Sequence, residues 1–294
     1  MFGANAMWGL MSPVVKLVLA TGLITPLVMV DFRVAGAAAL FWFASIFGKR
    51  KREHVPVKDL LLLAGAAMLG IVFNQGCFVV GINLTSPGEG SLFTTTMPMW
   101  VMLLAWVILH EPITLKKAGG IALGATGAII LVTNGSGHTA ASGSNPMLGD
   151  LIVLTAQLSY ALYLTLYRNF IRKYSLVTLM KWMFLFATVA MLPVTVGDLA
   201  TIDWNALPWQ SWAGIAYVVV GATFLAYICV MVGQKNLRPT IVGMYNYVQP
   251  IVAMVVGICL GLDDFTAIKA VAVVLIFGGV YLVTISKAAP LKDQ

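Results

Sequence analysis

The sequence predicts an all-α membrane protein with ten transmembrane helices arranged as two inverted five-helix repeats. Three observations predict this fold: a composition poor in charge, a series of long apolar runs, and a pattern of unusual residues that recurs after about 152 positions. Of the 294 residues, 60% are hydrophobic and 10% are charged, and the mean hydropathy is +0.92. Soluble domains carry roughly 25% charged residues. Most of this surface must therefore face lipid.

Apolar runs long enough to cross a bilayer recur along the whole chain. A transmembrane helix needs about 20 mostly apolar residues, whereas the strands of a membrane barrel show segments of about ten alternating residues. The runs here are longer and do not alternate, so we expect helices. They lie at about 2–20, 25–47, 59–81, 89–109, 115–133, 147–167, 176–197, 210–233, 240–260 and 266–286.

The positive charges lie almost entirely on one side of these predicted spans. Lys and Arg close to span ends are enriched on the cytoplasmic side of a membrane. With a cytoplasmic N-terminus, the opposite side holds Lys269 alone. The cytoplasmic side then holds Lys49, Arg50, Lys51, Arg52, Lys58, Lys116, Lys117, Arg168, Arg172, Lys173, Lys181, Lys235, Arg238, Lys287 and Lys292. We therefore expect a multi-pass protein of the bacterial inner membrane with both termini in the cytoplasm. Because the charges follow the loops and form no basic stripe, the net charge of +7 predicts no nucleic-acid partner.

The internal repeat divides the chain into two halves. At an offset of about 152 residues, aromatic, cationic, cysteine and proline positions coincide. The pairs include Trp8 with Tyr160, Asn5 with Gln157, Lys16 with Arg168, Cys77 with Cys229, Pro87 with Pro239, Pro98 with Pro250, Glu111 with Asp263, and Gly127 with Gly279. We expect a first half at 1–134, an external linker at 135–146, a second half at 147–287 and a cytoplasmic tail at 288–294. Five spans per half is an odd number, so the second half enters the membrane from the opposite side. Inverted repeats of this kind are a recurring plan of secondary transporters.

A set of short motifs is spread over the whole chain. It comprises Trp8-Gly9 and Lys16, Phe32-Arg33, Thr85-Ser86-Pro87, Pro98, His110-Glu111-Pro112-Ile113-Thr114, and the glycines Gly119, Gly120, Gly124 and Gly127. With these residues the chain resembles the EamA-like branch of the drug/metabolite transporter superfamily. The resemblance implies a ten-helix fold and solute transport, but it does not name a substrate. The second half departs from the pattern, because Asp263-Asp264-Phe265 stands where the first half has the glutamate–proline motif.

Polar and aromatic residues lie deep in several predicted spans and are candidates to bind the solute. An unpaired amide buried in hydrocarbon costs several kcal/mol, so these side chains must face one another or a cavity. Ordinary interhelical hydrogen bonding is the alternative for each of them. Together they would suit a neutral or zwitterionic solute with a flat or apolar part. The candidates are Asn5, Trp8, Ser12, Asn74, Gln75, Phe78, Thr95, Gln157, Tyr160, Tyr163, Tyr227, Tyr245 and Gln249.

Four charged residues within or next to the spans are candidates for charge recognition or ion coupling. They are Lys16, Asp31, Arg33 and Glu89. Intramembrane charges are costly and usually pair with one another or face water. One interpretation is that Arg33 or Lys16 binds a carboxylate, or that Glu89 or Asp31 carries a coupling proton. The other is an ion pair that serves folding, with Glu89 as the counter-charge.

Two prolines are candidate hinges. Pro98 and Pro250 occupy equivalent places near the middle of the fourth and ninth predicted spans. A proline inside a helix removes one backbone hydrogen bond and kinks the helix. A static bend is the alternative to a hinge.

Together these features favour a carrier over other classes of membrane protein. The three histidines fall in predicted loops, and the sequence offers no metal-ligand spacing, so we expect neither an enzyme nor a cofactor. A channel would need a filter-like loop. A membrane scaffold or sensor is the alternative to a carrier, although buried polar side chains would serve it no purpose. We expect a secondary-active exporter of a small organic metabolite, such as an amino acid or a related compound, that works by alternating access. Protons are the candidate coupling ion, and the carrier is expected to be a monomer or a homodimer.

Overall fold

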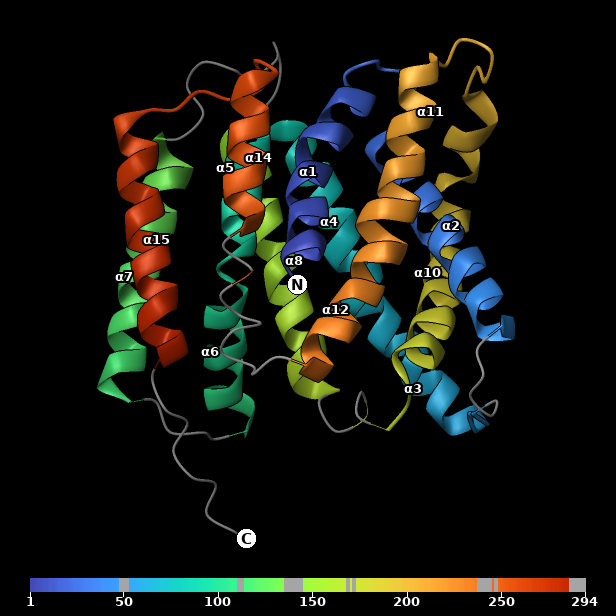
Figure 1. The fold of residues 1–294 in the computed structure, drawn as a ribbon, viewed down its shortest axis with the longest axis horizontal. Helices are drawn as coiled ribbons and strands as arrows, with labels where there is room; N and C mark the ends of the chain where they lie inside the picture. The colour runs from blue at the N-terminus through green and yellow to red at the C-terminus, as the bar shows by residue number, and fades with distance from the viewer. Residues whose placement is uncertain are drawn as a thin grey trace, which may run out of the picture.

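The computed structural model describes residues 1–47, 53–109, 114–134, 145–167, 170, 173–236, 245 and 248–285, and the regular structure in these ranges is helical (Figure 1). The first half contains α1 (Phe2–Leu19), α2 (Pro26–Phe47), α3 (Val57–Ala67), η1 (Met68–Phe73), α4 (Asn74–Leu84), α5 (Pro87–Thr94), α6 (Met97–Leu109) and α7 (Leu115–Asn134). The second half contains α8 (Pro146–Leu166), α10 (Leu176–Thr201), α11 (Trp209–Ala216), η2 (Tyr217–Leu225), α12 (Ala226–Asn236), α14 (Val248–Cys259) and α15 (Ala267–Ile285).

Length and composition make this a membrane fold. Within the described ranges, 7 helical stretches are long and apolar enough to cross a bilayer, and two shorter apolar helices cover Val248–Cys259 and Ala267–Leu282. Large apolar side chains such as Phe43, Val189 and Val274 are exposed on the outside of the bundle. An outward apolar surface is what a lipid environment requires. The expected linker lies outside the described residues except for Asn145 and Pro146, which cap the start of α8.

Helix bounds in the two halves coincide at the offset seen in the sequence. Val57 and Trp209 each begin a helix after a proline, and these two helices continue into the π-helical segments η1 and η2. The helices that follow, α4 and α12, start and end at equivalent positions. In Figure 1, α3 lies at the lower edge with α4 above it, whereas α11 lies at the upper edge with α12 below it. These two stretches therefore run in opposite directions.

The last helices of the two halves, α7 and α15, lie side by side at one edge of the bundle (Figure 1). Their backbones approach closely because small residues face each other. A Cβ atom built on Gly279 would lie only 2.5 Å from the carbonyl oxygen of Gly120 and 2.5 Å from the amide nitrogen of Gly124. Small residues allow such contact between membrane helices.

The fourth predicted span is interrupted, which changes the expected role of Pro98. The sequence predicts a proline inside one helix, but α5 ends at Thr94 and α6 begins at Met97, so Pro98 lies in the first turn of a new helix. Proline is tolerated there because the amide at that position has no partner within the helix. Pro250 likewise lies in the first turn of α14. The hydroxyl groups of Thr95 and Thr96 donate to the carbonyls of Leu92 and Phe93, which satisfies backbone groups at the break.

Candidate functional site

A cavity of about 330 Å³ lies between the two halves. Its walls come from α1, α2, α4, α5 and α6 of the first half and from α8, α12 and α14 of the second. Eight of the predicted solute-binding residues line it: Trp8, Asn74, Gln75, Phe78, Gln157, Tyr160, Tyr227 and Gln249. The remaining lining residues are Met1, Met11, Arg33, Ser91, Thr94, Met97, Leu164 and Val230.

Hydrogen bonds between the halves hold several of these side chains in place. The indole nitrogen of Trp8 donates to the carbonyl oxygen of Ala222 at 2.8 Å. The Trp8 ring meets that of Tyr227 edge to face, with the centroids 5.8 Å apart. The amide of Asn74 donates to the carbonyl oxygen of Ala156 at 2.9 Å. Because the partners are backbone groups of the opposite half, the cavity wall depends on how the halves sit against each other.

The other five predicted solute-binding residues do not line the cavity. Asn5 is buried behind it and accepts a hydrogen bond from the amide of Gln249 at 2.7 Å. Ser12 is fully buried, and its hydroxyl has no partner among the described atoms. Thr95 is buried at the helix break, and Tyr163 is buried next to Tyr160, at 5.6 Å between ring centroids. Tyr245 is partly buried and is not part of the wall.

Arg33 is the one cationic side chain among the described residues that line the cavity. Its side chain is 5% exposed, and its Nε atom donates to the hydroxyl of Thr223 at 2.9 Å. Over the described part of the chain, no carboxylate lies within ion-pair distance of this guanidinium. Asp31, two residues earlier, faces away and accepts a hydrogen bond from Thr195 of α10. Residues i and i+2 do not share a helix face. The guanidinium is therefore available to an anionic group in the cavity.

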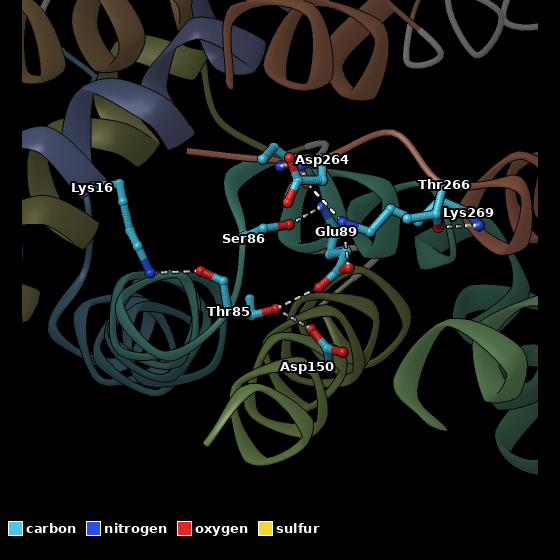
Figure 2. A network of polar contacts seen from close by, with 10 residues as sticks. Lys16, Thr85, Ser86, Glu89, Asp150, Asp264, Thr266 and Lys269 are labelled. Atoms are coloured by element: carbon cyan, nitrogen blue, oxygen red, sulfur yellow. Dashed lines mark hydrogen bonds and ion pairs between the residues drawn. The ribbon is translucent and has the colours of Figure 1, made fainter. Parts of the chain in front are cut away.

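Buried charges gather at the upper end of the bundle in Figure 1, where α5 begins and α14 ends (Figure 2). The ammonium group of Lys269, with a side chain only 3% exposed, lies 2.9 Å from Glu89 and 2.8 Å from Asp263. The second oxygen of Asp263 accepts from the backbone amide of Gly88 at 2.9 Å. Glu89 and Asp263 belong to different halves. This network therefore ties the halves together at the end where sequence analysis expects the external side.

Two more charged residues, Lys16 and Asp150, extend this network. Among the described contacts, Lys16 bonds to backbone carbonyls and forms no direct ion pair with Glu89. Its ammonium group donates to three carbonyl oxygens at the end of α4, those of Ile82, Asn83 and Thr85, at 3.0, 2.9 and 2.6 Å. The Thr85 hydroxyl lies 3.0 Å from Glu89 and 2.6 Å from Asp150, a carboxylate of α8 that is 1% exposed.

Sequence reasoning included Glu89 and Lys16 but not Asp150, Asp263 or Lys269 as site residues. Charged residues near the ends of spans are ordinary features of loops. The residue types of these three therefore did not mark them as site residues. One signal was present: Lys269 was the single cation on the expected external side. The structure accounts for it, because Lys269 is buried between two carboxylates.

Comparison with known proteins agrees with this architecture. A family described as the EamA-like transporter family matches residues 1–133 and 147–285. The uncharacterized transporter YyaM of Bacillus subtilis is 25% identical over 256 residues, which cover 86% of this chain and 84% of that protein. The uncharacterized inner membrane transporter YedA of Escherichia coli is 24% identical, covering 89% and 82% of the two chains. A solved crystal structure matches with a TM-score of 0.66 at 15% identity, covering 97% of this chain and 95% of its own, which supports the fold.

Proposed function

This chain belongs to the EamA-like transporter family, and on that premise we propose that it is a secondary-active carrier of a small organic metabolite in the bacterial inner membrane. The observation that carries the proposal is the central cavity, because both halves contribute polar and aromatic side chains to it. A polar pocket between the two halves of a membrane bundle is the kind of binding site that alternating access requires.

Two inverted halves would supply the conformational change. Their matching helix bounds and the opposite directions of α3–α4 and α11–α12 support the proposed repeat. If each half adopts the other's arrangement, the cavity opens to the opposite side. We take export as the direction, with the solute gradient or an ion gradient as the energy source. Pro98 and Pro250 are the proposed hinges, since each lies at the start of a helix beside the cavity.

The cavity chemistry favours a solute that carries a carboxylate and a flat or apolar part. The guanidinium of Arg33 supplies a fork of donors that matches a carboxylate. The rings of Trp8, Tyr160 and Tyr227 supply surface for the apolar part. No acidic side chain is among the residues that line the cavity in the described structure. A solute with only an ammonium group would therefore lack a counter-charge, whereas an amino acid would place its carboxylate on Arg33.

Transport by purified protein in proteoliposomes tests this proposal. Phenylalanine, phenylacetate and phenethylamine share one ring and differ in charge, so their competition in a counterflow assay separates carboxylate from amine recognition. We expect phenylalanine and phenylacetate to compete with the transported solute and phenethylamine not to compete. Loss of a charge-assisted hydrogen bond costs about 1.5–3 kcal/mol, so Arg33→Met should weaken competition by about 10- to 100-fold.

Two further variants control this experiment. Arg33→Lys keeps the positive charge but not the paired donors of the guanidinium. Its affinity for the carboxylate compounds should fall less than that of Arg33→Met. Lys173→Met removes a cation that is more than half exposed and is not among the residues that line the cavity. In this variant the three compounds should compete as they do with the wild type. Competition by phenethylamine alone would refute the carboxylate assignment. A protein that moves no solute in any arm, while remaining folded, would favour a scaffold or sensor.

A further inference from the structure

The two carboxyl contacts of the Thr85 hydroxyl call for one proton more than these residues hold when all their carboxyl groups are ionised. A threonine hydroxyl has one hydrogen to donate. Two carboxyl oxygens lie within hydrogen-bond distance of this hydroxyl, Oδ1 of Asp150 at 2.6 Å and Oε2 of Glu89 at 3.0 Å. The hydroxyl can donate to one of them. The other contact is a full two-centre hydrogen bond only if that carboxyl group is protonated and donates to the threonine oxygen.

The surroundings place this proton on Asp150. Glu89 has a counter-ion at 2.9 Å, the ammonium group of Lys269. Asp150 has no cation within ion-pair distance among the described residues, and its Oδ2 atom is buried without a hydrogen-bond partner. An ionised carboxylate with an unpaired, buried oxygen is costly. A neutral carboxylic acid that donates through Oδ1 fits the same contacts.

The charges around this site support the assignment. Lys269 and Asp263 face it from α15 and the segment before that helix, Glu89 faces it from α5, and Lys16 reaches the carbonyl of Thr85 from α1. With Asp150 neutral, the two ammonium groups balance the carboxylates of Glu89 and Asp263. With Asp150 ionised, the buried cluster carries one uncompensated negative charge, which a low-dielectric interior disfavours.

We infer that Asp150 is a proton-binding site, and that in this arrangement its proton is donated to Thr85, whose own hydroxyl donates to Glu89. The cluster joins both halves at the upper end in Figure 1, where opening would separate Glu89 from Lys269 and admit water. Release of the proton then leaves the Asp150 carboxylate hydrated. A second part of the inference rests on the proposed function: this proton moves together with the solute.

Infrared spectroscopy of the purified full chain tests the first part without any solute. A protonated carboxyl group has a carbonyl stretch that a carboxylate lacks. At neutral pH we expect this band in the wild type and its loss in Asp150→Asn. Thr85→Val should shift the band, because the acceptor of the hydrogen bond is gone. Asp198→Asn, which changes a carboxylate that accepts from Thr25 at the surface, should leave it unchanged. A band that persists in Asp150→Asn but disappears in Asp31→Asn would overturn the assignment.

A pH-sensitive dye trapped in proteoliposomes tests the second part. The readout is the ratio of protons to solute moved, which we expect to be measurable in the wild type and in Asp198→Asn and to fall to near zero in Asp150→Asn. Solute movement without protons in the wild type would refute coupling and leave the proposed transport intact. An infrared band that depends on Asp150 in a protein that moves no solute would uphold the proton site and refute the proposed function.

Discussion

At the scale of single residues, Lys269 is the charge whose loss should matter most for stability. It is the shared partner of Glu89 and Asp263, and all three side chains are buried. Removing one member of a buried ion pair leaves an uncompensated charge and costs about 3–5 kcal/mol. We expect Lys269→Met to lower the free energy of unfolding by about this amount, measured by thermal or denaturant unfolding in detergent.

Lys173 provides the matched control for this experiment. It forms an ion pair with Asp59, but its side chain is 54% exposed. The hydrogen bond to Asp59 raises the pKa of Lys173, so the pair stays ionised at neutral pH. Solvent screens such pairs, and most contribute little to stability. Lys173→Met should therefore unfold close to the wild type. If Lys269→Met and Lys173→Met lowered the free energy of unfolding equally, burial would not explain the contribution of Lys269 to stability.

Individual side chains show where sequence reasoning succeeds and where it stops. Trp8 and Gln75 could be predicted as cavity residues because polar groups deep in an apolar run must find a polar environment. Tyr163 has the same signal yet lies behind the cavity wall, since helical periodicity does not fix how far a helix is rotated. Asp150 could not be predicted as a network residue, because its meaning depends on Thr85 and Glu89, which come from a distant segment.

At the scale of elements, the close contact between α7 and α15 depends on glycines, and Gly279 is the tightest of them. A Cβ atom on Gly279 would meet backbone atoms of Gly120 and Gly124, which cannot move aside as a side chain can. We expect Gly279→Ala to push these helices apart and lower the melting temperature, even though alanine is the better helix former by about 0.8–1.0 kcal/mol. Thermal unfolding in detergent measures this effect.

Gly119 allows the opposite expectation to be tested in the same helix pair. A Cβ atom added there meets nothing within 4 Å. Gly119→Ala should therefore leave the melting temperature unchanged or raise it, because only the helix propensity changes. If the two substitutions had the same effect, close backbone approach would not explain the glycines of this interface.

Element boundaries were partly predictable. The apolar runs located the helices because hydrocarbon thickness fixes the length of a span. They did not reveal that the helix of the fourth span ends and a new helix begins around Thr95 and Thr96. Those residue types are compatible with one kinked helix as well as with two separate helices. They also did not reveal η1 and η2. In η1, the carbonyl of Leu69 accepts from the hydroxyl of Ser159 on α8, so a residue from the other half stabilises the irregular turn.

At the scale of the whole molecule, the two polar features lie at different depths. The cavity sits between the halves, and the charged network joins the same halves at one end of the bundle. A carrier that alternates must keep one end closed while the other admits solute. The network has the location of a closure: Glu89 of α5 pairs with Lys269 of α15, and the amide of Gly88 donates to Asp263 in the segment between α14 and α15. The proposed rocking motion would break both of these contacts.

A reversible crosslink at this end tests whether it opens during transport. A Cβ atom built on Gly257 of α14 would lie 3.9 Å from Cβ of Pro87 at the start of α5, within the range of about 3.5–4.5 Å for disulfides. After Cys77, Cys229 and Cys259 are replaced by alanine, the double variant Pro87→Cys, Gly257→Cys should lose counterflow activity on oxidation and regain it on reduction. The counterflow activity of each single cysteine variant should not change on oxidation, because that variant has no partner thiol. Unchanged counterflow in the oxidised double variant, with the crosslink shown to be complete, would mean that α5 and α14 do not separate during transport and that the network is a static support.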